Sequence, residues 1–185
     1  MSGHSHFSTI KHKKQAEDQK RGKVFSKLSR EISMAAKEKG KDPETNPKLR
    51  LVIEKAKQWN LPKDNIERAI KKGIGELKEG ALENIVFESY GPGGIAIIIE
   101  GITDNRTRTT GEIKQILNHY QGKLTSPGSV KWMFERKIDP KSDSLSWIAK
   151  QSIEIPEQEK TICQKLFEAL NENDAVQKIY SNLGV

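Results

Sequence analysis

Cysteine, aromatic residues and long apolar runs are all scarce in this chain of 185 residues. The single cysteine, Cys163, excludes an intramolecular disulfide and a multi-cysteine metal site, and it is typical of a reducing compartment. The longest apolar run, over residues 95–99, is too short to cross a bilayer. The N-terminal residues lack the apolar core of a secretory signal and the Arg-rich pattern of a transit peptide. The sequence therefore predicts a cytoplasmic protein.

Charge is abundant but unevenly distributed. Residues 1–80 hold 20 Lys and Arg against 11 Asp and Glu, whereas residues 81–185 hold 12 against 14. A dense basic element beside a slightly acidic remainder indicates a polyanionic partner, because each phosphate that a cation neutralises releases condensed counterions. The alternative is a solvated Lys-rich helix face without a partner.

Residues 1–80 are predicted to form a basic all-helical module of three helices. Apolar residues recur with helical spacing over residues 10–39, with Gly22 as a weak point in the more polar first half. Asn46 and Pro47 have the pattern of an N-cap and a first helical position, and they open a second helix that reaches Trp59. A third, short helix follows Pro62 and stops at Gly73. Trp59 is predicted to lie in the core, as is Trp132 further along the chain.

Residues 81–185 are predicted to form a ferredoxin-like α+β sandwich, so that the fold class of the whole chain is α+β. Strands are expected at residues 85–90, 95–100, 130–134, 152–155 and 176–180, with helices from a cap at Asp104 and Asn105 to Gly122 and over residues 157–171. The segment 91–94 joins two strands and lacks the Lys-Ser/Thr of a phosphate loop, which favours a hairpin turn. Residues 137–148 have the composition of a polar linker.

Several segments carry a family resemblance when taken in order along the chain. They are MSGHS at 1–5, IKHKK at 10–14, KRGK at 20–23, KLSREI at 27–32, NPKLR at 46–50, LPKDNIERAI at 61–70, YGPGG at 90–94, TDNRTRT at 103–109, GSV at 128–130, MFER at 133–136 and VQKIYSN at 176–182. In these segments the chain resembles the YebC/PmpR family of bacterial transcriptional regulatory proteins. That family is related to the mitochondrial translational activator of cytochrome oxidase.

The resemblance implies transcriptional regulation through DNA binding. The residues themselves predict a non-enzymatic protein, since the sequence shows no convergent acid, base or nucleophile. An RNA-binding translation factor that associates with ribosomal RNA or tRNA is the alternative, because a Lys-rich helix suits either backbone. Two departures stand out. The dipeptide His6-Phe7 replaces the more usual Lys-Trp, and the third domain that relatives insert into the second is expected to be missing, with residues 137–148 in its place.

The candidate nucleic-acid-binding residues are basic side chains, with one histidine among them. Phosphate contacts from Lys and Arg position a protein on a nucleic acid without reading its sequence. Arg106 and Arg108 adjoin a predicted helix N-terminus, where an anion is favoured, although simple capping is the alternative. The full set is Lys11, His12, Lys13, Lys14, Lys20, Arg21, Lys23, Lys27, Arg30, Arg68, Lys71, Lys72, Arg106 and Arg108.

No catalytic residue, metal ligand or cofactor site is predicted. His4, His6 and His12 have only loose metal-like spacing and no paired cysteine. Cys163 falls on the apolar stripe of a helix, which favours a core position over a nucleophile. The expected partner is nucleic acid, either DNA or ribosomal RNA or tRNA, with a protein partner for the α+β domain, and neither a membrane nor a small-molecule substrate.

Overall fold

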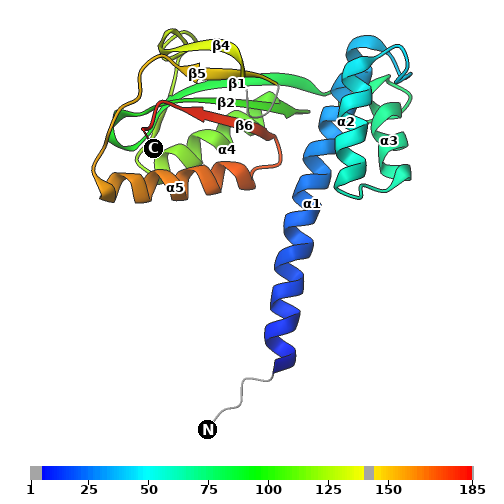
Figure 1. The fold of residues 1–185 in the computed structure, drawn as a ribbon, viewed down its shortest axis with the longest axis horizontal. Coiled ribbons are helices and arrows are strands. Elements are labelled where there is room, and N and C mark those ends of the chain that lie inside the picture. The colour runs from blue at the N-terminus through cyan, green and yellow to red at the C-terminus, as the bar shows by residue number, and fades with distance from the viewer. Residues whose placement is uncertain (1–5, 140–143, 185) are drawn as a thin grey trace. The chain divides into compact units, whose positions relative to one another are not determined.

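The computed structural model describes the backbone of residues 6–139 and 144–184 and the side chains of residues 17–138 and 145–184. The chain divides into two compact units, Met1–Ala81 and Leu82–Val185 (Figure 1). Within the described residues, no helix is both long and apolar enough to span a membrane.

The first unit consists of the helices α1 (His6–Lys39), α2 (Pro47–Gln58) and α3 (Lys63–Gly73). Its core gathers the apolar faces of all three, including Leu28 and Ile32 of α1, Leu49 of α2 and Ile66 of α3. The helix α1 is much longer than its neighbours and continues without a break through Gly22 (Figure 1). Among the side chains of α1 that the structure describes, the buried core residues begin at Leu28, and Val24 and Phe25 pack against the core from the turn before it.

Hydrogen bonds of the Asn46 side chain link the start of α2 to the end of α1. Its side-chain oxygen accepts from the Leu49 backbone N–H at 3.1 Å, which confirms the predicted N-cap. Its amide nitrogen also donates to the Ala35 carbonyl at 2.8 Å and to the Gly40 carbonyl at 2.9 Å. Asn46 is fully buried, and its bonds to the Leu49 N–H and the Ala35 carbonyl are buried, so water does not replace a partner lost there.

Replacing Asn46 by alanine should lower the free energy of unfolding of the first unit by about 2–4 kcal/mol, since a cap is lost and buried carbonyls lose their donor. Asn65→Ala, on the exposed face of α3, is the matched control and should change it by less than about 0.5 kcal/mol. Hydrogen exchange of the amides in the first unit, measured for each variant, gives the two changes in free energy. Equal free energies of unfolding for the two variants would show that the hydrogen bonds of Asn46 do not stabilise the first unit.

The ends of α2 and α3 are set by local backbone geometry. After α2, the Asn60 N–H donates to the Lys57 carbonyl and the Leu61 N–H to the Ala56 carbonyl, with Asn60 at φ 56°. This pattern is a Schellman motif, and Leu61 is its buried apolar residue. The predicted stop at Gly73 is confirmed, but the left-handed residue is Gly75 at φ 80°. Gly73 serves close packing, because a Cβ there would clash with the Ser33 carbonyl of α1.

The second unit is built on a four-stranded antiparallel sheet of order β3-β1-β2-β6. Its strands are β1 (Glu83–Tyr90), β2 (Ala96–Thr103), β3 (Lys123–Thr125) and β6 (Val176–Ser181). The helices α4 (Arg106–His119) and α5 (Glu157–Glu172) lie on one face of this sheet (Figure 1). The predicted α+β class, with both helices on one face, is therefore confirmed.

Two local predictions within this unit are confirmed. The segment 91–94 is the turn between β1 and β2 and contains a short 3-10 helix, η1 (Pro92–Gly94), with Gly93 at φ 66°. A side chain at Gly93 would also meet Ile155 and Glu159, so the turn needs glycine for both conformation and space. Cys163 is fully buried between the helices and the sheet, and burial, reinforced by the charge of Glu159, raises the pKa of its thiol.

Three predictions in the second half of this unit are wrong. Residues 131–133 form a 3-10 helix, η2 (Lys131–Met133), and a strand begins only at Phe134. Residues 152–155 are not a strand, because only Ile153 pairs, in an isolated bridge to Leu183. The supposed linker 137–148 belongs mostly to β4 (Phe134–Asp139) and β5 (Ser144–Ala149), which pair with each other in a separate antiparallel hairpin.

The hairpin of β4 and β5 covers the second face of the sheet. Phe134 packs there with Ala96 and Ile98 of β2. A polar cluster adds to this packing, because Trp147 Nε1 donates to Glu100 Oε1 at 2.8 Å and Arg136 pairs with the same carboxylate at 3.4 Å. Burial, followed by the charge of Glu100, raises the pKa of nearby Tyr180 to about 12. The linker prediction failed because the segment is polar in composition, whereas the apolar side chains that hold the hairpin on the sheet, Phe134, Trp147 and Ala149, are few and widely spaced.

Candidate nucleic-acid interface

Four basic residues of α1 form a stripe along one side of the helix. Lys20, Lys23, Lys27 and Arg30 follow one another at spacings of three and four residues, which places them on one face. We call these four residues the cationic stripe, and at 1.5 Å per residue it extends for about 15 Å along the helix axis. Lys20 is exposed, whereas the other three are partly exposed. The core residues Leu28 and Ile32 lie on a different side of α1.

The remaining candidates on α1 differ in what the structure describes of them. Arg21 is exposed, and its guanidinium lies over the Phe25 ring at 5.3 Å from the ring centre. The positions of Lys11, His12, Lys13 and Lys14 belong to the first turns of α1, but their side chains lie outside the described residues. The phosphate contacts expected of them remain predictions.

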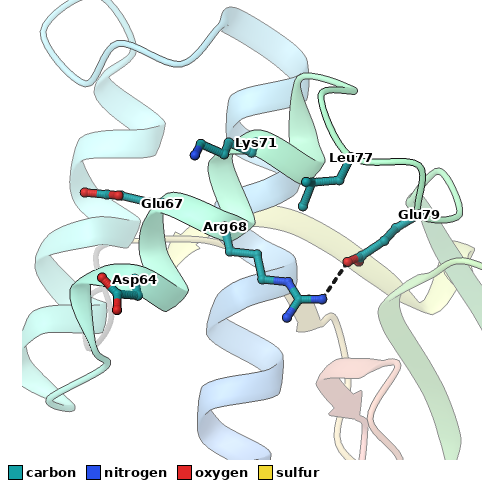
Figure 2. A pocket seen from close by; sticks show the side chains of 6 residues that line it. All are labelled: Asp64, Glu67, Arg68, Lys71, Leu77 and Glu79. Atoms are coloured by element: carbon teal, nitrogen blue, oxygen red, sulfur yellow. Dashed lines mark hydrogen bonds and ion pairs between the residues drawn. The ribbon is translucent and has the colours of Figure 1, made fainter.

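Two of the three candidates on α3 form ion pairs with a carboxylate on the segment that follows the helix. Arg68 pairs with Glu79 at 2.8 Å and Lys72 pairs with it at 2.9 Å, as Figure 2 shows for Arg68. The hydrogen bond from Arg68, followed by the bond and charge of Lys72, lowers the pKa of Glu79 to about 2. Two of the three α3 candidates therefore already have a counter-charge, and only Lys71 has no ion pair within the described part of the chain.

A cavity of about 390 Å³ lies beside these residues, and its lining carries both signs of charge. Arg68 and Lys71 share this lining with three carboxylates, those of Asp64 and Glu67 on the same helix and that of Glu79 opposite Arg68 (Figure 2). Carboxylates in this number disfavour a bound phosphate, because like charges repel at short range. The cavity is consequently a poor site for an anion.

The start of α4 is a capped helix end surrounded by ion pairs. Asn105 accepts from the Arg108 backbone N–H at 2.9 Å, so the predicted cap is confirmed. The Arg108 guanidinium pairs with Asp104 at 2.7 Å and with Glu112 at 3.7 Å. Arg106 pairs with Glu83 at 3.4 Å. Both arginines thus have carboxylate partners, and a phosphate would have to compete with them.

Two tryptophans predicted to be core residues are instead exposed. Trp59 is 51% exposed at the end of α2, and Trp132 is 65% exposed in η2 of the other unit. The prediction for Trp59 was wrong because the helix ends before it, and Leu61 takes the buried place through the Schellman motif. The Asn-Leu-Pro sequence after Trp59 is the signal that could have revealed this. No group of His, Cys, Asp and Glu in the described residues is arranged to hold a metal ion.

Comparison with known proteins gives consistent matches along nearly the whole chain. The profile described as "TACO1/YebC protein N-terminal domain" matches residues 5–76. The one described as "TACO1/YebC second and third domain" matches residues 82–139 and 137–183. A crystal structure of a conserved hypothetical protein, Aq1575 from Aquifex aeolicus, is 33% identical with a TM-score of 0.83, covering 89% of this chain and 90% of that chain.

Two curated relatives are named as probable transcriptional regulatory proteins. Cphamn1_0542 of Chlorobium phaeobacteroides is 46% identical over 193 residues, which is 100% of this chain and 77% of the relative. GSU1074 of Geobacter sulfurreducens is 56% identical over 137 residues, which is 74% of this chain and 56% of the relative. The match to GSU1074 therefore spans little more than half of that protein's length.

The fold and these matches define a two-unit α+β protein whose first unit is a basic three-helix module. More particularly, the chain belongs to the TACO1/YebC family.

Proposed function

We propose that this protein is a non-enzymatic, DNA-binding transcriptional regulator that grips the phosphate backbone with its N-terminal basic helices. The observation that carries the proposal is the cationic stripe of α1, which is set apart from the core side of the helix. A row of Lys and Arg on a straight helix suits a regular row of phosphates and needs no base contact. The names of the curated relatives support the regulatory role.

The second unit has a different part in this proposal. Its arginines at the start of α4 are engaged by Asp104, Glu112 and Glu83, and its overall charge is slightly acidic. Such a surface adds little to phosphate binding. We assign to this unit the role of a rigid body that contacts a protein partner.

An RNA-binding factor that associates with ribosomes is the second candidate function. One observation favours it, because the exposed Trp59 on the basic unit suits the unpaired bases that are common in RNA loops. Co-sedimentation of the protein with ribosomes would support this candidate. Crosslinking to promoter fragments would support the DNA-binding regulator.

Titration of labelled duplexes of unrelated sequence tests the binding mode directly. Backbone binding predicts similar affinities for all of them and a steep, linear fall of log affinity with log salt concentration. Fluorescence anisotropy at several salt concentrations gives both quantities. Affinity that differs widely between sequences and barely responds to salt would contradict the proposal.

Glu79→Gln should strengthen nucleic-acid binding by roughly 2–5-fold at low salt, since it removes the carboxylate that holds Arg68 and Lys72. The matched control is Glu76→Gln, which removes a neighbouring carboxylate whose contact with Lys41 is long, at 3.9 Å. Anisotropy titrations of both variants against one duplex provide the comparison. An equal gain in the two variants would show that general charge, and not these two cations, is responsible.

A further inference from the structure

The end of α2 holds an exposed aromatic side chain on a well-defined backbone. Trp59 is the C-cap of α2, and its N–H donates to the Lys55 carbonyl at 3.2 Å. The Schellman bonds of Asn60 and Leu61 follow directly, at 2.9 Å each, and Leu61 is buried. An indole that remains 51% exposed on so fixed a backbone loses little freedom when a planar ligand stacks on it.

The chain around Trp59 is uniformly basic. From residue 55 to residue 63 it contains Lys55, Lys57 and Lys63 and no Asp or Glu. All three lysines are exposed. Lys55 pairs with Glu31 at 3.3 Å and Lys63 pairs with Glu67 at 3.6 Å, so a phosphate would compete with a carboxylate for each of these two lysines. The stretch itself still carries a net positive charge.

Ion pairs between α1 and α2 show which part of α1 lies beside Trp59. Lys48 pairs with Glu38 at 2.7 Å and Lys55 pairs with Glu31 at 3.3 Å, so the two helices run antiparallel. Trp59 lies four residues after Lys55, which is about one helical turn further along the chain. Lys27 lies four residues before Glu31, on the same side of α1. This register brings Trp59 to the level of Lys27, which belongs to the cationic stripe.

We propose that Trp59 is a stacking platform for an unpaired nucleobase, while the cationic stripe of α1 holds the phosphates of the same strand. This inference rests on the proposed nucleic-acid binding of the first unit and adds a single strand to the duplex DNA that the unit is proposed to bind. An aromatic ring beside a basic strip is the combination that single-stranded nucleic acid requires, because every base has a face that can stack. A paired base within a duplex has no free face to offer.

The test compares binding to a fluorescein-labelled oligo(U) RNA of about 20 nucleotides with binding to a duplex of equal length. Trp59→Ala should weaken binding to the single strand by about 10-fold, with the salt dependence and the duplex affinity unchanged. Trp59→Phe should retain most of the affinity because a ring remains. Trp132→Ala removes an exposed tryptophan of the other unit and should have no effect. The single strand should also quench the tryptophan fluorescence of the Trp132→Phe protein but not that of the Trp59→Phe protein.

A variant with Lys20, Lys23 and Lys27 replaced by alanine separates this inference from the function on which it rests. If that variant loses affinity while Trp59→Ala binds the single strand normally, the stacking proposal is overturned and phosphate binding stands. If the lysine variant also binds normally, both proposals fail.

Discussion

Replacing Lys11, Lys13, Lys14, Lys20, Arg21 and Lys23 together by alanine should weaken nucleic-acid binding by about 100-fold or more at low salt. Each lost phosphate contact removes about 0.9 from the slope of log affinity against log salt on duplex DNA and about 0.7 on a single strand. If all six residues contact phosphates, the slope should fall by about five on a duplex or about four on a single strand. Anisotropy titrations at several salt concentrations measure both quantities.

The matched control removes six positive charges from the second unit. Its substitutions to alanine are at Lys114, Lys123, Lys137, Lys150, Lys160 and Lys165. Both variants have the same net charge, so only the location of the charge differs. Equal losses of affinity would show a general charge effect and would contradict an interface on α1. The fold should be little changed in the first variant, because Lys20 and Arg21 are exposed.

Glu88→Gln should lower the free energy of unfolding of the second unit by about 2–4 kcal/mol. Glu88 lies in β1 and is only 3% exposed. Its carboxylate accepts from the backbone N–H groups of Gly128 at 2.7 Å, Val130 at 2.8 Å and Lys131 at 2.9 Å. A glutamine keeps the shape but turns a donor toward N–H groups that need an acceptor. Hydrogen exchange in the second unit reports the change.

The matched control for this substitution is Glu83→Gln in the same strand. Glu83 is exposed, and its contact with Arg106 is 3.4 Å long, so the change in stability should stay below about 0.5 kcal/mol. A loss equal to that of Glu88→Gln would show that the buried hydrogen bonds are not the cause.

Glu88 also predicts how the stability of the second unit depends on pH. Burial by itself would raise the pKa of this carboxyl group, but the three backbone N–H donors and the charge of Lys131 outweigh it and hold the pKa below its usual value of 4.5. The stabilisation is therefore complete above the pKa of the unfolded chain and is lost as pH falls through the lower pKa of the folded state. Hydrogen exchange below pH 4.5 should show a steeper loss for the wild-type chain than for Glu88→Gln.

Local signals were the predictable part of this fold. The caps at Asn46 and Asn105 and the turn at residues 91–94 depend on a few neighbouring residues, and all are confirmed. The structure after residue 130 depends on contacts with residues that are distant in the sequence, namely the sheet that the β4–β5 hairpin covers and Leu183. Ile153 has β propensity but pairs only with Leu183. Residues 137–139 and 144–148 are polar in composition, yet they belong to two strands that pair with each other and cover the second face of the sheet.

In the candidate site, too, local features are predictable from the sequence and contacts between distant residues are not. Sequence alone locates the basic cluster and its spacing on one helix, because charge and helical period are local properties. It does not reveal that Glu79 folds back onto Arg68, since that pairing depends on the path of the chain after α3. Nor does it reveal that Trp59 lies outside the core, because exposure is decided by how α2 ends against its neighbours.

Crosslinking in living cells, with identification of both the crosslinked peptides and the attached nucleic acid, tests the central claim most directly. The account predicts that nucleic acid is recovered and that its crosslinks fall on α1, between residues 11 and 30, and at Trp59. The nature of the recovered strand decides between promoter DNA and ribosomal RNA. Recovery of no nucleic acid, or crosslinks confined to residues 82–185, would contradict the assignment of the first unit as the binding unit.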